Sequence, residues 1–118
     1  MAALSRIAPE LPVSNLQNSI KYYEESLGFE LAMQMPGGDY AIVERDDVAI
    51  HLFQDDASLV PVGVHIFTPD LEALHEELSQ HDAHITQPIE LKPWGNREFR
   101  VKDDSGNILK FTEATSNA

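Results

Sequence analysis

The fold is decided by Val13-Ser14-Asn15-Leu16, because the same kind of junction returns 55 positions later as Thr68-Pro69-Asp70-Leu71. Each tetrapeptide joins the end of a short apolar segment to the start of a helical pattern. A second match, at an offset of 59, pairs Ile50-His51-Leu52-Phe53 with Leu109-Lys110-Phe111-Thr112. Self-similarity at a nearly fixed period is stronger evidence for architecture than any single propensity. The chain is therefore predicted to repeat one unit twice.

The first unit, about residues 7–53, predicts a strand, a helix and three further strands. Apolar residues recur at helical spacing from Leu16 to Leu27, with Asn15 placed to cap the helix and Gly28 to end it. The strands are expected at residues 7–13, 29–35, 40–45 and 48–53, the last two joined by the tight turn Asp46-Asp47.

The second unit, about residues 62–113, follows the linker 54–61 and repeats this order. Pro69 and Asp70 open a helix whose apolar stripe is Leu71, Leu74 and Leu78. Its strands are expected at residues 62–67, 84–87, 97–102 and 108–113. A chain of 118 residues has the usual length of one domain, so residues 1–118 are predicted to form one α+β domain of two β-α-β-β-β repeats.

Composition narrows the possible partners. The net charge of −12 disfavours nucleic acid and anionic membranes, because both repel an acidic surface. The chain has no cysteine, which excludes disulfides, thiolate metal sites and cysteine nucleophiles. We expect no secretory leader in residues 1–10 and no membrane span, since no apolar run approaches about 18 residues. The prediction is a cytoplasmic protein.

Three stretches resemble the glyoxalase, bleomycin-resistance and extradiol-dioxygenase superfamily, which has the vicinal-oxygen-chelate fold. They are residues 11–29 with Leu27-Gly28-Phe29, residues 64–70, and Trp94-Gly95-Asn96-Arg97-Glu98-Phe99 leading to Asp103-Asp104-Ser105-Gly106-Asn107. The last resembles the ending of bleomycin-resistance-like members. The resemblance implies that each unit curls its mixed sheet into half of an open cup around a small-molecule site. It also implies a homodimer, in which cups form within or between chains.

In metal-using members of that family, the ligands occupy places that correspond here to Ala8, His51, Gly63 and Lys110. Only His51 is a conventional ligand, and Lys110 brings a cation where a carboxylate would neutralise the metal. We therefore expect no metal or other cofactor. A divalent metal remains the alternative, held at relocated positions by His51 and His65 with Glu10 or Glu98.

Strand alternation predicts which side chains face the cup. The opposite face is expected to carry Ile7, Leu11, Val48, Ile50, Leu52, Val64, Ile66, Phe99, Val101, Leu109 and Phe111, which are all apolar. The predicted ligand-binding residues are Glu10, His51, Phe53, His65, Phe67, Trp94, Glu98, Arg100 and Lys110, with Thr112 on the same face. Aromatic, acidic and basic groups together suit a mixed binding site.

Ordinary structural roles compete with these assignments. His51 could be a hydrogen-bonded strand histidine, and Arg100 or Lys110 could pair with Glu98 or Glu10 as surface ion pairs. His75, His81 and His84 are expected to be solvated, and Trp94 to lie on an exposed rim loop.

The leading interpretation is a metal-independent binding protein of the bleomycin-resistance type, a homodimer that sequesters a small molecule in grooves between subunits. The alternatives are a metal-dependent glyoxalase- or dioxygenase-type enzyme, and a metal-free lyase or isomerase with Glu98 as base and Arg100 or Lys110 stabilising an oxyanion. The patterns GxSxG, GxxxxGK and GxGxxG are absent. A flat, neutral or cationic ligand is slightly favoured by the negative net charge, against which Arg100 and Lys110 argue.

Overall fold

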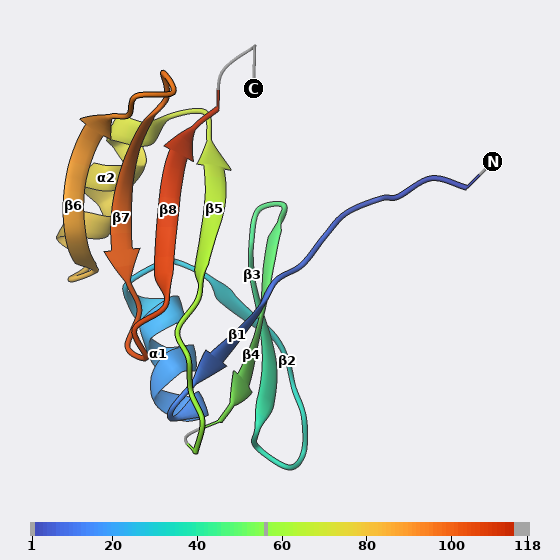
Figure 1. Cartoon of the computed structure of the whole chain (residues 1–118). Helices are drawn as coiled ribbons and strands as arrows, with labels where there is room; N and C mark the ends of the chain where they lie inside the picture. Colours follow the sequence, from blue (N-terminus) through green and yellow to red (C-terminus); the bar gives the residue numbers. More distant parts are fainter. Residues whose placement is uncertain (1, 56, 115–118) are drawn as a thin grey trace.

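The chain folds into two β-α-β-β-β units, which Figure 1 shows in sequence order. The computed structural model describes residues 2–55 and 57–114; Met1, Asp56 and residues 115–118, which fall within the predicted domain and linker, lie outside the described residues. The first unit comprises β1 (Glu10–Val13), α1 (Leu16–Glu25), β2 (Glu30–Gln34), β3 (Tyr40–Arg45) and β4 (Val48–Gln54). The second comprises β5 (Gly63–Thr68), α2 (Leu71–Gln80), β6 (His84–Leu91), β7 (Arg97–Lys102) and β8 (Ile108–Glu113). The predicted α+β architecture with a repeated unit is confirmed.

Each unit forms one open, four-stranded mixed sheet, in the orders β1-β4-β3-β2 and β5-β8-β7-β6. The first strand of each unit runs parallel to the last, and the other neighbours are antiparallel. The registers of the two sheets correspond. Glu10 lies level with His51 in the first sheet, as His65 lies level with Lys110 in the second.

The two largest differences from the predicted strand boundaries, in β1 and β6, both involve proline, whereas β2, β4 and β5 differ from prediction by one residue at one or both ends. The first strand begins at Glu10 and not at Ile7, because Pro9 has no N–H to continue the ladder; Ile7 is 92% exposed, so its predicted burial is wrong. Strand β6 continues past Gln87 to Leu91 in spite of Pro88. It is an edge strand with register shifts on both sides of Gln87, where a missing donor is tolerated.

Both helices begin at the predicted caps. The Asn15 side chain accepts a hydrogen bond from the backbone N–H of Asn18 at 3.0 Å, and Asp70 accepts one from Ala73 at 3.1 Å. Gly28 follows α1 with φ of +75°, a conformation that favours glycine. Among the described residues, no helix is both long enough and apolar enough to cross a membrane.

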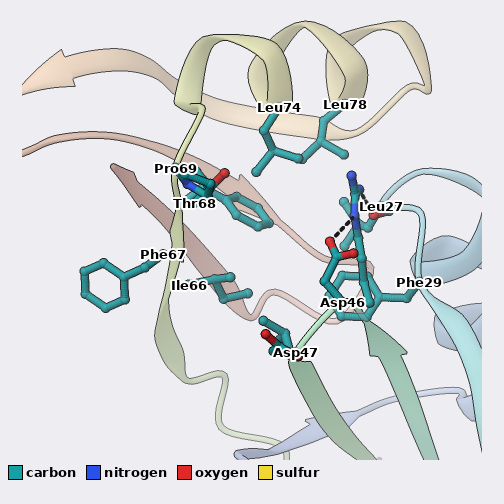
Figure 2. Close-up of a pocket in the computed structure, with 13 residues that line it drawn as sticks. Leu27, Phe29, Asp46, Asp47, Ile66, Phe67, Thr68, Pro69, Leu74 and Leu78 are labelled. Atoms are coloured by element: carbon teal, nitrogen blue, oxygen red, sulfur yellow. Dashed lines mark hydrogen bonds and ion pairs between the residues drawn. The ribbon is translucent and has the colours of Figure 1, made fainter. Parts of the chain in front are cut away.

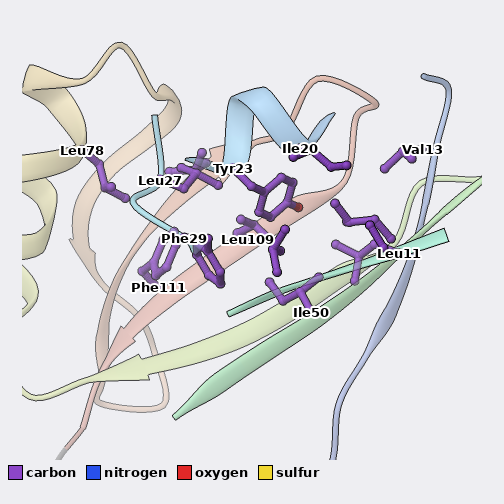
Figure 3. Packing of buried hydrophobic residues seen from close by; sticks show 14 of the residues in the cluster. Leu11, Val13, Ile20, Tyr23, Leu27, Phe29, Ile50, Leu78, Leu109 and Phe111 are labelled. Atoms are coloured by element: carbon purple, nitrogen blue, oxygen red, sulfur yellow. The ribbon is translucent and has the colours of Figure 1, made fainter. Parts of the chain in front are cut away.

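The two units share one apolar core, which Figure 3 shows between the sheets and α1. The predicted alternation is confirmed in the central strands, because the side chains of alternate residues are buried on the helix side. They are Leu11, Val13, Ala41, Val43, Ile50, Leu52, Phe99, Val101, Leu109 and Phe111. Burying one such aliphatic or aromatic side chain contributes about 1.5–3 kcal/mol. The opposite face of each sheet is left for polar groups.

The units are also joined by polar contacts between the helix of each unit and the central hairpin turn of the other. Tyr23 on α1 donates a hydrogen bond to Asp103 in the β7–β8 turn at 2.9 Å. Arg45, at the end of β3, forms an ion pair of 2.7 Å with Glu77 on α2. The two halves are therefore joined by polar contacts in both directions across the interface between them.

Candidate functional site

The candidate site consists of the two sheet faces that point away from the helices. We call them the first open face, built on β1, β3 and β4, and the second open face, built on β5, β7 and β8. The predicted residues divide between them: Glu10, His51 and Phe53 lie on the first, and His65, Phe67, Glu98, Arg100, Lys110 and Thr112 lie on the second.

Three polar side chains form a chain of contacts on the first open face. The Tyr40 hydroxyl donates to Glu10 Oε2 at 2.9 Å and lies 2.6 Å from His51 Nδ1. A hydroxyl has one proton, so both contacts are satisfied when His51 donates its Nδ1–H to Tyr40. Partial desolvation and then the bond to Glu10 raise the pKa of Tyr40, which keeps the phenol protonated at neutral pH.

Sequence reasoning missed Tyr40, although a signal for it was present. Ala41 and Val43 are apolar and alternate along β3, so Tyr40 and Ile42 had to lie on the other face. The register then places Tyr40 level with Phe53 and Ile42 level with His51. The sequence prediction places this strand correctly, but it does not assign the Tyr40 side chain to a face of the sheet.

Glu98 is the unusual residue of the second open face, because its side chain is completely buried. Its Oε2 accepts a 2.7 Å hydrogen bond from Arg100 Nε, whereas its Oε1 has no partner among the described residues. Removing a carboxylate from water is costly unless its oxygens are paired. An orphan oxygen of this kind marks a place where a ligand or water donor is favourable.

The two cations beside Glu98, Arg100 and Lys110, differ in their partners. Arg100 lies level with Lys110 on the neighbouring strand, so two positive charges are adjacent. Glu98 neutralises Arg100, and the Lys110 side chain has no hydrogen bond or ion pair within residues 2–55 and 57–114. The predicted ion pair of Arg100 with Glu98 is thus confirmed, and Lys110 is available to an acceptor group.

His65 and Phe67 form the outer part of the same face. Their rings stack with centroids 6.3 Å apart, and His65 Nδ1 lies 3.3 Å from the Thr112 hydroxyl. Phe67 is 55% exposed. An exposed aromatic ring next to a hydrogen-bonding imidazole offers a surface on which a flat molecule can stack.

Strand β6 adds polar residues that the sequence prediction did not include, because that strand was expected to end at Gln87. Lys92 Nζ bonds to Gln87 Oε1 at 2.9 Å and to Glu90 Oε1 at 3.0 Å. Gln87 Nε2 in turn donates to the backbone oxygen of Glu98 at 3.4 Å. The second open face therefore has a polar border on its β6 side.

Trp94 lies in the turn between β6 and β7 and is 64% exposed, as predicted for a rim residue. Gly95 follows it with φ of +103°. The predicted solvation holds for His81 and His84, which are exposed, but is wrong for His75. That ring is partly buried edge-on against Phe99, with centroids 4.9 Å apart.

The described residues of a single chain do not bring the fallback metal ligands together. The fallback ligands Glu10 and His51 lie on the first open face, and His65 and Glu98 on the second. Within the described part of the chain, no group of three or more histidine, aspartate or glutamate side chains is arranged to hold a metal ion. No hydrogen bond or ion pair between described residues links the two open faces either.

Comparison with known proteins places this geometry in a family. Residues 3–111 match the model of the Glyoxalase/Bleomycin resistance protein/Dioxygenase superfamily. A bleomycin resistance protein of Geobacillus stearothermophilus is 27% identical over 124 residues, covering 87% of this chain and 92% of that protein. Sequence similarity therefore extends over nearly the whole of both chains.

Solved structures of proteins with related names have a similar fold. A bleomycin-binding protein from bleomycin-producing Streptomyces verticillus, complexed with copper(II)-bleomycin, matches with a TM-score of 0.79 and 26% identity, covering 98% of this chain and 100% of that chain. A bleomycin resistance determinant encoded on the transposon Tn5 matches with a TM-score of 0.83 and 18% identity, covering 93% of this chain and 98% of that one. With a family model that spans residues 3–111 and with this shared fold, the chain belongs to the glyoxalase/bleomycin resistance protein/dioxygenase superfamily.

Proposed function

We propose that this protein binds a small molecule on its open faces and releases it unchanged, as a binding protein of the bleomycin-resistance type. The observation that carries the proposal is the buried Glu98, whose Oε1 lacks a partner beside Arg100 and Lys110. A ligand N–H group would satisfy that oxygen and recover part of the cost of burying it. The Streptomyces verticillus relative, which is named for binding bleomycin, supports a ligand of this general kind.

The ligand that these groups suit is flat and carries both donors and acceptors. Glu98 Oε1 accepts hydrogen bonds, whereas Lys110 donates them. Phe67 and Trp94 supply exposed aromatic surface. Short-range contacts of this kind decide orientation, while the net charge of −12 raises the local concentration of cationic molecules.

A homodimer is part of the proposal, because one chain does not bring its two open faces together. A second copy related by a two-fold axis would place the first open face of each chain opposite the second open face of the other. This arrangement makes two equal grooves. It would also cover apolar side chains that are exposed in one chain, among them Phe67 and Leu91.

A cytoplasmic location is also proposed. It is supported by the absence of cysteine, since such a chain needs no oxidising compartment to fold.

A metal-free lyase or isomerase is the second candidate, favoured by one observation. Glu98 is buried next to two cations, so a carboxylate that accepts a proton would lie near groups that can stabilise a developing oxyanion. The two candidates differ in the fate of the ligand. A binding protein returns it unchanged, and an enzyme returns a product.

Fluorescence of Trp94 tests the proposal, since this is the only tryptophan. Metal-free bleomycin, copper(II)-bleomycin and a panel of cationic and anionic heteroaromatic molecules would be titrated at two salt concentrations. We expect saturable quenching by at least one of them, and recovery of the intact compound by mass spectrometry. Conversion of the bound compound would favour the lyase.

Matched variants assign the site. Glu98→Gln keeps the shape and replaces one acceptor, and Lys110→Met removes the charge. Both should weaken binding, whereas Lys21→Met, on the exposed side of α1, should not. Metal analysis of protein purified without a metal-affinity tag would accompany the titrations. One metal per chain that disappears in His51→Ala would favour the metalloenzyme.

A further inference from the structure

A cavity of about 340 Å³ lies between the two units on the helix side of the sheets. Figure 2 shows its walls, which are mainly apolar: Leu27 and Phe29 from the first unit, and Ile66, Leu74 and Leu78 from the second. Phe111 of the second unit also lines the cavity. Phe67 is also among the lining residues, but its ring points away from the apolar side chains that form the walls. The cavity is therefore separate from the site proposed above.

The repeat explains why space is left here. In the first unit, the corresponding place is filled by the β7–β8 turn, residues 103–107. Asn107 Nδ2 donates to the Pro12 carbonyl at 2.8 Å, Ser105 Oγ accepts from the Ser14 N–H at 2.9 Å, and Asp103 accepts from Tyr23. This turn and the Tyr23 ring together close the space between α1, β1 and the other unit.

The second unit lacks both of these parts. Its cavity faces the β3–β4 turn, which has only Asp46 and Asp47 where the other has five residues. The offset of 55 between the helices places Leu78 where the first unit has Tyr23, so a shorter side chain stands in place of the ring. The cavity is thus the space that a longer turn and a tyrosine fill in the other half.

The mouth of the cavity is acidic. Arg45 donates to both oxygens of Glu77, at 2.7 and 2.8 Å, and to the Leu27 carbonyl at 2.8 Å, so its charge is already neutralised. Asp46 lies 3.8 Å from Arg45 Nε and is 88% exposed, and Asp47 has no hydrogen bond or ion pair among the described residues. Two carboxylates therefore remain at the edge of an apolar chamber.

We propose that this cavity is a second binding site, which takes small amines with an apolar body. A volume of 340 Å³ falls within the usual range for small-ligand pockets, and a chamber lined by leucine, isoleucine and phenylalanine favours a hydrocarbon or aromatic group over water. The ammonium group would lie at the mouth, near Asp46 and Asp47. This proposal does not depend on the function proposed for the open faces.

The probe is 2-phenylethylamine, compared with its neutral and anionic analogues 2-phenylethanol and 3-phenylpropionate. Amide chemical shifts of the isotope-labelled full chain would be followed during each titration. We expect the amine to shift the signals of Phe29, Val48, Ile66 and Phe111, and to leave those of His51 and Lys110 in place. The alcohol should bind more weakly, and the propionate weakest of the three.

Two variants separate the contributions of charge and shape. Asp46→Asn with Asp47→Asn should weaken amine binding about fivefold, as expected for two exposed carboxylates, and the effect should fade at high salt. Leu78→Tyr should fill the chamber and abolish binding. Neither variant should alter ligand-induced quenching of Trp94, so failure here can be told apart from failure of the proposed function.

Three results would overturn the proposal. One is equal affinity for the propionate, another is shifts confined to the open faces, and the third is binding that survives the paired aspartate substitutions unchanged. Cavity signals that respond to protein concentration and not to the amine would identify a contact between copies instead. Because Asp46 and Asp47 lie on an exposed turn, that variant keeps the test valid even if Leu78→Tyr does not fold.

Discussion

The Tyr23 hydroxyl donates a 2.9 Å hydrogen bond to Asp103, a residue 80 positions later in the other unit. Both side chains are buried, and the same carboxylate oxygen also accepts from Asn107 Nδ2 at 2.9 Å. This contact fixes the helix of the first unit to the last turn of the second. Loss of this hydrogen bond should therefore lower the stability of the whole fold.

Tyr23→Phe is expected to lower the free energy of unfolding by about 1–3 kcal/mol, because a buried carboxylate oxygen loses one of its two donors while the ring is kept. Urea unfolding followed by circular dichroism would measure the change. Tyr40→Phe is the matched control, since Tyr40 binds only residues of its own unit. A larger effect at Tyr40 than at Tyr23 would contradict this account of how the units are joined.

Stability should fall at alkaline pH. Burial, and then the negative charge of Asp103, raise the pKa of Tyr23 well above its ordinary value near 10. A raised pKa means that the folded state binds the phenol proton more tightly than the unfolded state does. The stabilising effect of the protonated Tyr23 is therefore present below pH about 10 and is lost as the pH rises further. Tyrosinate absorbance and circular dichroism should show Tyr23 ionising together with unfolding. In Tyr23→Phe this alkaline loss should be smaller.

The contribution of the Arg45–Glu77 ion pair to stability should be lost at acidic pH and not at alkaline pH. The hydrogen bond from Arg45 lowers the pKa of Glu77 below 4.5. A lowered pKa stabilises the folded state above the unfolded value, and this contribution is lost as the pH falls through the folded value. Carbon-13 shifts of the Glu77 carboxylate would give the titration directly. Arg45→Met should return that titration toward the ordinary range, whereas Arg97→Met should leave it unchanged.

Arg100→Ala should destabilise the protein more than the exposure of Arg100 suggests, because it leaves the buried Glu98 carboxylate with neither oxygen paired. Arg100 is 32% exposed, so part of its interaction is screened by solvent, and we expect about 1–3 kcal/mol. In a Glu98→Gln background the same change should cost less. Unfolding of all four proteins in the double-mutant cycle would measure the coupling. Equal costs in both backgrounds would show that the pair is not coupled.

Light scattering at micromolar concentration should give twice the 13.2 kDa mass of one chain. Trp94 quenching measured against protein concentration would then test whether the grooves need two copies. Binding and dimer formation should appear over the same concentration range. A monomer that binds as tightly as the dimer would argue for grooves within one chain.

The sequence was sufficient to predict the repeated unit, because cap residues and alternating apolar strands are local features. Asn15 and Asp70 cap the predicted helices, and strands β3, β7 and β8 begin and end where expected. Alternation alone also separated buried residues such as Phe99 from open-face residues such as Arg100. These properties need no knowledge of how the units pack.

The features that the sequence did not predict depend on contacts between residues that are far apart in the chain. The contact of His75 with Phe99 follows from how α2 covers one face of the second sheet, and the burial of Glu98 on the other face depends on its neighbours on β6 and β8. The cavity could have been anticipated in part, since the two turns differ in length in the sequence. Whether a turn fills the space or leaves it open depends on how that turn packs on the other unit. The sequence alone does not give this packing.

Pro88 and the register shifts around Gln87 make β6 an irregular edge. An incoming strand meets neither a complete row of donors nor an even register there, so it cannot add to the second sheet along β6. The sheet is thus protected against growth by stacking of like molecules at this border. Contacts between sheet edges, which can propagate into fibres, are therefore disfavoured at this border.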